Sequence, residues 1–178
     1  MTRIATPAIA DATGATAEVY AQIKKAAGAV PNTFATIGAH GPAALKAVLA
    51  ADGALAAGSL GRQDQETIKL LVSEIASCDY CVAAHTMLGK MAGLSRETMK
   101  QIRGFKPTGD ARRDALVRFV RILQQTRGTI IQPEFDAIKA AGYTDQQIVE
   151  ISLAIAVTVF TNVFNRINDT AVDFPAAD

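Results

Sequence analysis

Both cysteines of this 178-residue chain and one of its two histidines lie within eight positions, in the stretch SCDYCVAAH that begins at Ser77. If this stretch is helical, Cys78, Cys81 and His85 project from one helix face. Cα atoms three positions apart in a helix are separated by roughly 5 Å, which is inside the range that a disulfide needs. The spacing therefore allows a dithiol that closes and reopens without moving the backbone.

The same stretch could supply the proton chemistry of a reactive thiol. Ser77 is a suitable N-cap residue, which would place Cys78 in the first turn of a helix, where the helix dipole favours a thiolate. His85, one turn beyond Cys81, is spaced to exchange a proton with that sulfur. The helix start favours Cys78 as the attacking cysteine and the histidine favours Cys81, so the spacing leaves both open.

A proton relay of this kind needs a carboxylate, and two glutamates are candidates. Glu74 lies four positions before Cys78, on the same stripe if one helix runs through both. Glu66 lies twelve positions before Cys78, in the preceding segment. Spacing alone favours Glu74, but a bend at residues 77–78 would make the relation tertiary and would leave Glu66 open.

Two other interpretations of the cysteines compete with a redox dithiol. Free cysteine is often a small buried hydrophobe, so helix packing alone is one of them. A zinc site is the other, but it would need Cys78, Cys81, His85 and also the distant His40. Attachment of a c-type haem is excluded, because His85 does not directly follow Cys81. We favour the redox dithiol.

The composition fits a single domain, residues 1–178, because 49% of the residues are hydrophobic and can close one core. The net charge is +1 with acids and bases interspersed, so neither a nucleic-acid-binding nor an anionic-membrane-binding surface is expected. The N-terminus lacks the apolar segment of a signal peptide, which predicts a cytoplasmic protein in a reducing compartment. The stretch 148–164 is too polar for a membrane span, and a buried helix is expected there.

Glycines, prolines and capping residues divide the chain into segments with helical periodicity and almost no strand-like alternation. Helices are expected at residues 15–27, 41–58, 59–76, 96–103, 111–127, 132–141 and 145 to about 167, with a short turn or helix after residue 30 and a helix ending near residue 92. These segments predict an all-α bundle of about eight helices. The last helix is apolar nearly all round, which implies burial on more than one side, in a core or between subunits.

A weak internal echo pairs residues 64–85 with residues 145–166. It indicates two similar helical halves unless it is a chance similarity between amphipathic helices.

One spaced pattern unites the candidate residues: Glu66, eleven residues, Cys78, two residues, Cys81, three residues and His85. This pattern resembles the E-x11-C-x2-C-x3-H signature of the AhpD-like alkylhydroperoxidases, in the carboxymuconolactone decarboxylase superfamily. The resemblance extends to VPNTF at residues 30–34, to GLS at 93–95, and to the last helix and the VDFP at 172–175 that follows it. It thus covers most of the chain.

The resemblance implies an AhpD-like helical fold, a homo-oligomer of three or six subunits, and chemistry without a metal or an organic cofactor. Cys78 and Cys81 would be the redox pair, and His85 and Glu66 the proton relay, so the resemblance prefers Glu66 to Glu74. A thiolate would attack the O–O bond of a hydroperoxide substrate, and the resulting sulfenic acid would condense with the second thiol. A dithiol or lipoyl-type protein reductant would then reduce the disulfide.

Tyr80 is a departure from the family pattern, since some members have a second histidine between the cysteines. This departure predicts weak peroxidase activity or another substrate. Other enzymes of the superfamily decarboxylate a carboxylated lactone and do not rely on a CxxC pair. Such a reaction, on a lactone or another small carboxylated substrate, is the alternative function, and the two cysteines argue against it.

Overall fold

The computed structural model describes residues 2–177, and within that range it is all helical, without a strand. A short 3-10 turn, η1 (Ile9–Asp11), precedes nine α-helices. The helices are α1 (Gly14–Ala27), α2 (Asn32–His40), α3 (Pro42–Ala56), α4 (Arg62–Ile75), α5 (Asp79–Met91), α6 (Arg96–Arg103), α7 (Ala111–Thr126), α8 (Gln132–Ala140) and α9 (Asp145–Asn168). The all-α class predicted from the sequence is confirmed.

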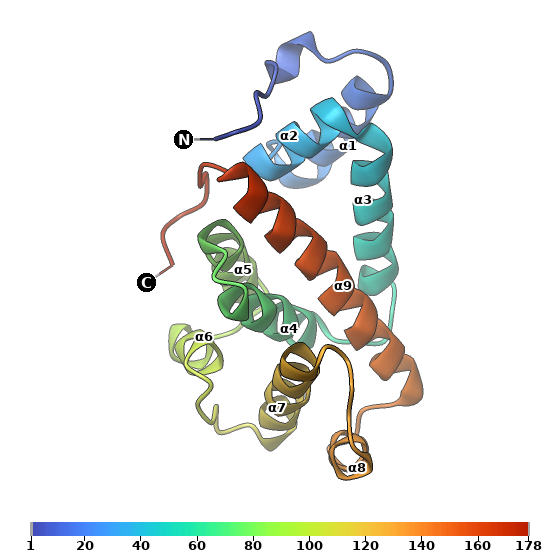
Figure 1. The fold of residues 1–178 in the computed structure, drawn as a ribbon, viewed down its shortest axis with the longest axis vertical. Helices are drawn as coiled ribbons and strands as arrows, with labels where there is room; N and C mark the ends of the chain where they lie inside the picture. Colours follow the sequence, from blue (N-terminus) through green and yellow to red (C-terminus); the bar gives the residue numbers. More distant parts are fainter. Residues whose placement is uncertain (1, 178) are drawn as a thin grey trace.

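The long helix α9 crosses the molecule, with α1 and α2 near its C-terminal end, α3 alongside it, and α7 and α8 near its start (Figure 1). Helix α4 packs against α5, α7 and α9, so it is the centre of the larger apolar core. A second apolar cluster joins α1, α2 and α3 through side chains such as Val19, Ile23 and Leu45. The cysteines belong to a third, small cluster, which lies at the start of α5.

Capping residues set several helix boundaries where the sequence predicts them. The Ser95 hydroxyl accepts a hydrogen bond from the Thr98 N–H and caps the N-terminus of α6. Asp110 accepts from two backbone N–H groups at the start of α7. Thr144 forms a capping box at the start of α9. Each cap satisfies N–H groups that have no partner inside the helix, which is why these ends could be predicted locally.

Within this chain, helix α9 is buried along one stripe, which carries several polar side chains, and its expected burial between subunits stays a prediction. The buried polar side chains of α9 are Thr158, Asn162, Asn165 and Asn168. The large hydrophobic side chains that α9 leaves exposed are Val149, Val159, Phe160, Val163 and Ile167. The helix therefore buries hydrogen-bonding groups and presents an apolar face to the outside.

Helix α9 is also long and apolar enough to cross a membrane by length and composition, although only 28% of its most apolar 18-residue window is buried in the protein. The test is weak evidence for a span, since core helices of water-soluble proteins also pass it. The prediction that residues 148–164 form a helix is confirmed, and the helix is less buried than expected.

The internal echo does not correspond to two similar structures. Residues 64–85 fold as parts of two helices, α4 and α5, with a bend between them, whereas residues 145–166 lie in the unbroken helix α9.

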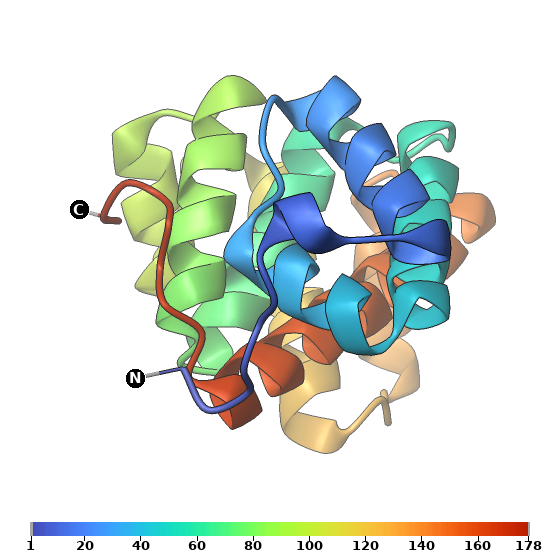
Figure 2. The ribbon, with the colours of Figure 1, turned by 90° about the horizontal axis from the view of Figure 1, so that it is seen from above.

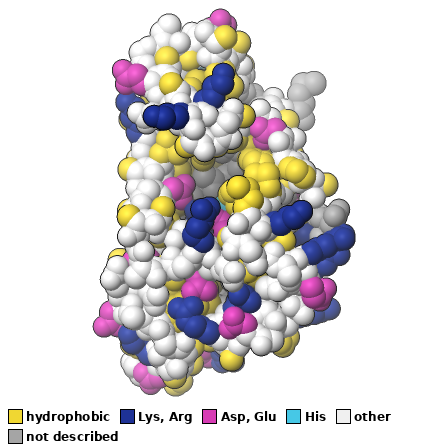
Figure 3. All heavy atoms as spheres, turned by 180° about the vertical axis from the view of Figure 1, so that it is seen from behind, with side chains coloured by type: hydrophobic (Ala, Val, Ile, Leu, Met, Phe, Trp, Pro, Cys, Tyr) yellow, Lys and Arg dark blue, Asp and Glu magenta, His cyan; other side chains and the backbone are white. Residues whose placement is uncertain are grey.

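The two ends of the described chain lie on the same side of the molecule (Figure 2). The Arg3 N–H donates to the Asn168 carbonyl at 2.8 Å, which ties the N-terminal segment to the end of α9. On the face shown in Figure 3, positive and negative side chains are interspersed and no patch of one sign stands out. This mixture is in line with the near-zero net charge.

Candidate dithiol site

A bend between α4 and α5 places the first cysteine. Helix α4 ends at Ile75, Ser77 adopts a left-handed conformation with φ of 51°, and α5 begins at Asp79. The N-cap of α5 is Cys78 itself, whose sulfur accepts a hydrogen bond from the Cys81 N–H at 3.3 Å. The prediction of Ser77 as the cap was therefore wrong by one residue, and Cys78 precedes the first turn instead of lying in it. The helix N-terminus nevertheless faces this sulfur, which favours a thiolate there.

Cys78 and Cys81 form a disulfide, with their Cα atoms 5.3 Å apart. Both residues are almost fully buried, with 2% and 3% of their surface exposed. Three positions across the first turn of α5 thus give the separation that a disulfide needs.

His85 and Glu66 meet across the α4–α5 interface. The Nδ1 atom of His85 lies 2.9 Å from Oε2 of Glu66, and both side chains are largely buried. Burial by itself would raise the pKa of the Glu66 carboxyl, but the hydrogen bond with His85 and the charges of His85, Lys69 and Arg62 outweigh it, so the pKa is lowered. Glu66 is therefore a carboxylate at neutral pH and can hold the histidine ring in one orientation.

Glu74, the alternative carboxylate, has a different partner. Its Oε2 atom accepts from Nε of Arg103 at 2.6 Å, in a link between α4 and α6. The bend at Ser77 turns Glu74 off the stripe that an unbroken helix would share with Cys78. The structure thus pairs His85 with Glu66, as the resemblance implies.

Asn165 is a site residue that sequence reasoning did not single out. Its side-chain nitrogen donates to Sγ of Cys81 at 3.3 Å, and its side-chain oxygen accepts from the Thr33 hydroxyl at 2.7 Å. The Thr33 bond fixes the orientation of the amide, so that the N–H points at the sulfur. The sequence signal for such a contact is an asparagine in a largely apolar helix, because a buried side-chain amide needs hydrogen-bond partners.

Tyr80 occupies the position between the cysteines and links them to the C-terminal segment. Its hydroxyl accepts from the Thr33 N–H at 3.2 Å, and its ring meets the Phe174 ring edge-on, with centroids 5.3 Å apart. Burial raises the pKa of the Tyr80 hydroxyl, so this group stays neutral. A neutral Tyr80 hydroxyl cannot take the place of a histidine in proton exchange.

A pocket of about 350 Å³ reaches one of the two cysteines. Cys81 and His85 lie in its wall, and Cys78 does not. Most of the other lining side chains are apolar, including Pro31, Phe34, Met87, Leu88, Val157 and Phe174. The pocket suits a compact, largely hydrophobic molecule whose reactive group can reach Cys81.

One ion pair lies in the wall of this pocket. Lys69 donates to Oδ1 of Asp52 at 2.7 Å, and only 12% of its side chain is exposed. The pair satisfies both charges, so the wall carries no isolated charge at this point.

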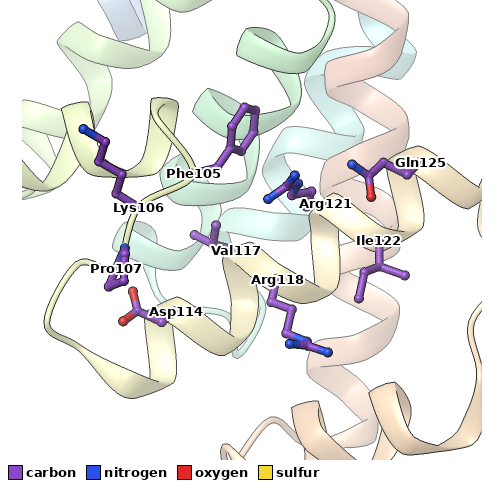
Figure 4. Close-up of a pocket in the computed structure, with 9 residues that line it drawn as sticks. All are labelled: Phe105, Lys106, Pro107, Asp114, Val117, Arg118, Arg121, Ile122 and Gln125. Atoms are coloured by element: carbon purple, nitrogen blue, oxygen red, sulfur yellow. The ribbon is translucent and has the colours of Figure 1, made fainter.

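A hollow of about 320 Å³ between the α6–α7 loop and α7 is a poor candidate for the active site (Figure 4). Its wall holds basic side chains, among them Arg118 and Arg121, but neither cysteine and no histidine. Arg118 pairs with Glu134, and the Arg121 guanidinium lies over the Phe105 ring at 4.9 Å. These partners give the basic groups structural roles.

The zinc alternative needs His40 beside the cysteines, and the structure places it elsewhere. Nε2 of His40 lies 2.8 Å from the Ala5 carbonyl oxygen. Within residues 2–177, no three His, Cys, Asp or Glu side chains come together in a group that could hold a metal ion.

Comparison with known proteins gives one family match. Residues 42–106 match the model of the carboxymuconolactone decarboxylase family, and this segment contains Glu66, both cysteines and His85. No curated protein matches the chain in sequence.

Several solved structures share the fold. A peroxidase-related protein from Ralstonia eutropha with an alkylhydroperoxidase AhpD core is 23% identical, with a TM-score of 0.86 over 97% of this chain and 92% of that chain. A peroxidase-related protein from Silicibacter sp. is 20% identical, with a TM-score of 0.78 over 96% and 91%. The debrominase Bmp8 is 19% identical, with a TM-score of 0.79 over 97% and 93%. These likenesses confirm the AhpD-like fold.

Proposed function

We propose that this chain reduces organic hydroperoxides through its cysteine pair; its fold is AhpD-like, and its residues 42–106 match the carboxymuconolactone decarboxylase family. One observation carries the proposal: Cys81 of the cysteine pair and His85 of the buried Glu66–His85 pair line the same largely apolar pocket. A nucleophile, a proton-transfer group and the carboxylate that orients it are the parts that thiol-based peroxide reduction needs.

Cys81 is the attacking residue in this proposal, because it lies in the pocket wall with His85 and accepts the Asn165 N–H. In the reduced enzyme His85 takes the proton of the Cys81 thiol, the thiolate attacks one peroxide oxygen, the O–O bond breaks, and the leaving alkoxide takes that proton from His85. Cys81 is then a sulfenic acid. The Cys78 thiol attacks that sulfur and forms the disulfide, and water leaves.

Glu66 acts on this chemistry as a positioning residue. Its carboxylate accepts the His85 Nδ1–H, which leaves Nε2 of the ring for proton exchange. Without the carboxylate, the ring would lose its fixed tautomer and orientation.

The enzyme must be re-reduced after each turnover, and we propose that a dithiol or a lipoyl-type protein does this. A reducing cytoplasm would keep such a donor available. The exposed apolar face of α9 supports a homo-oligomer, since exposed apolar patches often mark protein–protein interfaces.

The first test follows the thiols of fully reduced protein after one equivalent of cumene hydroperoxide. Two thiols should be lost within minutes, and the intact mass should fall by the two hydrogens of a new disulfide. Thiols that persist for hours would reject the peroxidase proposal.

Matched variants then assign the roles. Cys81→Ser should abolish the fast reaction, and Glu66→Gln and His85→Gln should slow it by roughly 10²-fold or more, the usual contribution of acid–base catalysis. Glu74→Gln is the control, because Glu74 pairs with Arg103 and should leave the rate unchanged. Equal rates in the Glu66 and Glu74 variants would remove Glu66 from the mechanism.

Thiol-dependent dehalogenation is a second candidate function. The apolar pocket at Cys81 supports it, and among the solved structures that share the fold is a cysteine-to-alanine variant of the debrominase Bmp8 in complex with 2,3,4-tribromopyrrole. In such a reaction, two thiols supply two electrons, carbon–bromine becomes carbon–hydrogen, and bromide leaves. The test measures bromide release from a bromopyrrole by reduced protein. A rate of release higher than the rate of thiol loss with hydroperoxide would favour this function.

A lactone or decarboxylation activity, the alternative suggested by the family name, does not need the thiols. The double variant Cys78→Ser with Cys81→Ser separates it from both thiol reactions. Turnover of a carboxylated lactone that survives in this variant would establish the alternative.

A further inference from the structure

We propose that the reductant reaches the disulfide through a second hollow, separate from the peroxide pocket, where it attacks Cys78. This inference rests on the proposed function of the peroxide pocket. It gives a hydrophilic dithiol its own route to the disulfide. It also assigns Cys81 to the reaction with peroxide and Cys78 to the reaction with the reductant.

The two cysteines belong to different hollows. Cys81 lines the apolar pocket of about 350 Å³, and Cys78 lines another hollow of about 270 Å³. Neither cysteine lines both. Tyr80 and Asn165 contribute to both walls, so they form the partition between the two spaces.

The second hollow has a different chemical character from the peroxide pocket. It lies where the α4–α5 bend faces the end of α9 and is lined by Ser77, Asp79, Arg166, Asp169 and Thr170, besides Cys78. Water-soluble dithiols carry hydroxyl, amide or charged groups, which lose hydration in an apolar pocket and keep hydrogen-bond partners in a polar one. The hollow therefore fits the reductant better than the peroxide pocket does.

The local geometry also suits attack on Cys78. A reductant thiolate forms a bond to Sγ of Cys78, the disulfide bond breaks, and its electron pair stays on Sγ of Cys81. That leaving thiolate is stabilised by the Asn165 N–H at 3.3 Å, and a better-stabilised leaving thiolate departs faster.

The second step completes a two-electron transfer. The other thiol of the reductant attacks the reductant's own sulfur in the mixed disulfide, and Cys78 leaves as a thiolate. This leaving sulfur is stabilised by the Cys81 N–H at 3.3 Å and by the start of α5. The reductant leaves as a disulfide, and the enzyme is again a dithiol.

The test measures the two half-reactions separately in two variants. Val172→Trp fills the polar hollow from an exposed position, and Thr161→Phe fills the apolar pocket. Oxidation is followed with cumene hydroperoxide on reduced protein, and reduction with dithiothreitol on protein oxidised by diamide. Val172→Trp should slow reduction several-fold and leave oxidation at the wild-type rate, whereas Thr161→Phe should do the reverse. Circular dichroism and thermal unfolding confirm that both variants fold.

A ligand provides the same test in wild-type protein. Cumyl alcohol, the product of cumene hydroperoxide reduction, should slow oxidation by competing for the apolar pocket. It should leave the rate of reduction by dithiothreitol unchanged.

The inference is overturned if Val172→Trp leaves reduction at the wild-type rate, or if Thr161→Phe and cumyl alcohol slow reduction as much as oxidation. The reductant would then enter through the peroxide pocket. Failure of the proposed function gives a different result, because wild-type protein would not be oxidised by hydroperoxide. The diamide-oxidised protein would still report on the polar hollow.

Discussion

At the scale of single residues, Asn165 is the group whose contact with sulfur is easiest to test. Replacing it by leucine removes the N–H donor to Cys81 and keeps the approximate volume. A hydrogen bond to a charged group is worth about 1.5–3 kcal/mol, so the Cys81 thiolate should form less readily and its alkylation should require a higher pH. The measurement is the pH dependence of alkylation of reduced protein by iodoacetamide, in the background Cys78→Ser.

Asn162 provides a matched control for this prediction. It is buried on the same helix one turn earlier, its oxygen accepts from Ser73, and its side-chain nitrogen has no partner within the described residues. Asn162→Leu should leave the alkylation profile in place. A profile that shifts equally in both variants would mean that the effect is structural and not a contact with sulfur.

Glu66 gives a prediction about acid stability. Its pKa is lowered in the folded protein, so its contribution to the free energy of unfolding is complete above the unfolded-state pKa of about 4.3 and is lost as the pH falls through the folded-state value. In the variant Glu66→Gln the side chain has no carboxyl that acid could protonate, so this pH-dependent contribution is absent. The variant's free energy of unfolding, measured by urea titration, should fall less steeply below pH 5 than that of the wild type. Equal slopes would contradict the prediction.

At the scale of elements, the segment after α9 acts as a cover for the cysteine pair. Asp173 accepts from the Asn32 N–H at 2.9 Å, and the Asn32 side chain donates to the Ala171 carbonyl, which holds the segment against α2. The Phe174 ring packs against the cluster of Cys78, Tyr80 and Cys81. These contacts hold the segment over the cysteine pair.

Phe174→Ala should loosen this cover. Loss of the edge-on ring contact with Tyr80 removes about 0.5–1.5 kcal/mol beyond the buried area, so alkylation of the reduced cysteines by a bulky maleimide should accelerate several-fold. The exposed Pro175→Ala is the control. Unchanged alkylation in Phe174→Ala would show that the segment does not limit access.

The elements also show where sequence reasoning succeeds and where it stops. The starts of α6, α7 and α9 could be predicted because the N-cap residues Ser95, Asp110 and Thr144 form local hydrogen bonds. The choice between Glu66 and Glu74 could not be made from spacing, because it depends on a left-handed residue at the bend, Ser77. The family resemblance supplied this choice instead.

Helix α9 shows a second limit of the same kind. A helix that is apolar nearly all round predicts burial but does not reveal which stripe faces inward. The C-terminal part of the inward stripe is polar because Asn165 and Asn168 have specific partners: Thr33 and Cys81 for the first, the Ile4 N–H and Thr170 for the second. Those partners come from distant parts of the chain or from the turn after the helix.

At the scale of the whole molecule, the outward stripe of α9 predicts self-association. Val159, Phe160, Val163 and Ile167 are exposed on this helix, and an adjoining hollow of about 550 Å³ is lined by Val72, Ile75 and other side chains. Burying apolar surface against a second copy would contribute roughly 25 cal/mol per Å². A homo-oligomer therefore offers this face the cover that the single chain lacks.

Val163→Glu combined with Ile167→Glu should prevent this association, because burying two unpaired carboxylates would cost more than the remaining apolar contacts return. Size-exclusion chromatography with light scattering should show an oligomer for the wild type and a monomer for the double variant. Ile131→Glu is the control, since Ile131 is similarly exposed just before α8, which lies near the start of α9 and away from its C-terminal half. Cys81 contacts Asn165 on the inward stripe of α9, whereas Val163 and Ile167 are exposed, so the monomer should still lose two thiols to hydroperoxide. A monomeric wild type, or a control that also dissociates, would remove α9 as the interface.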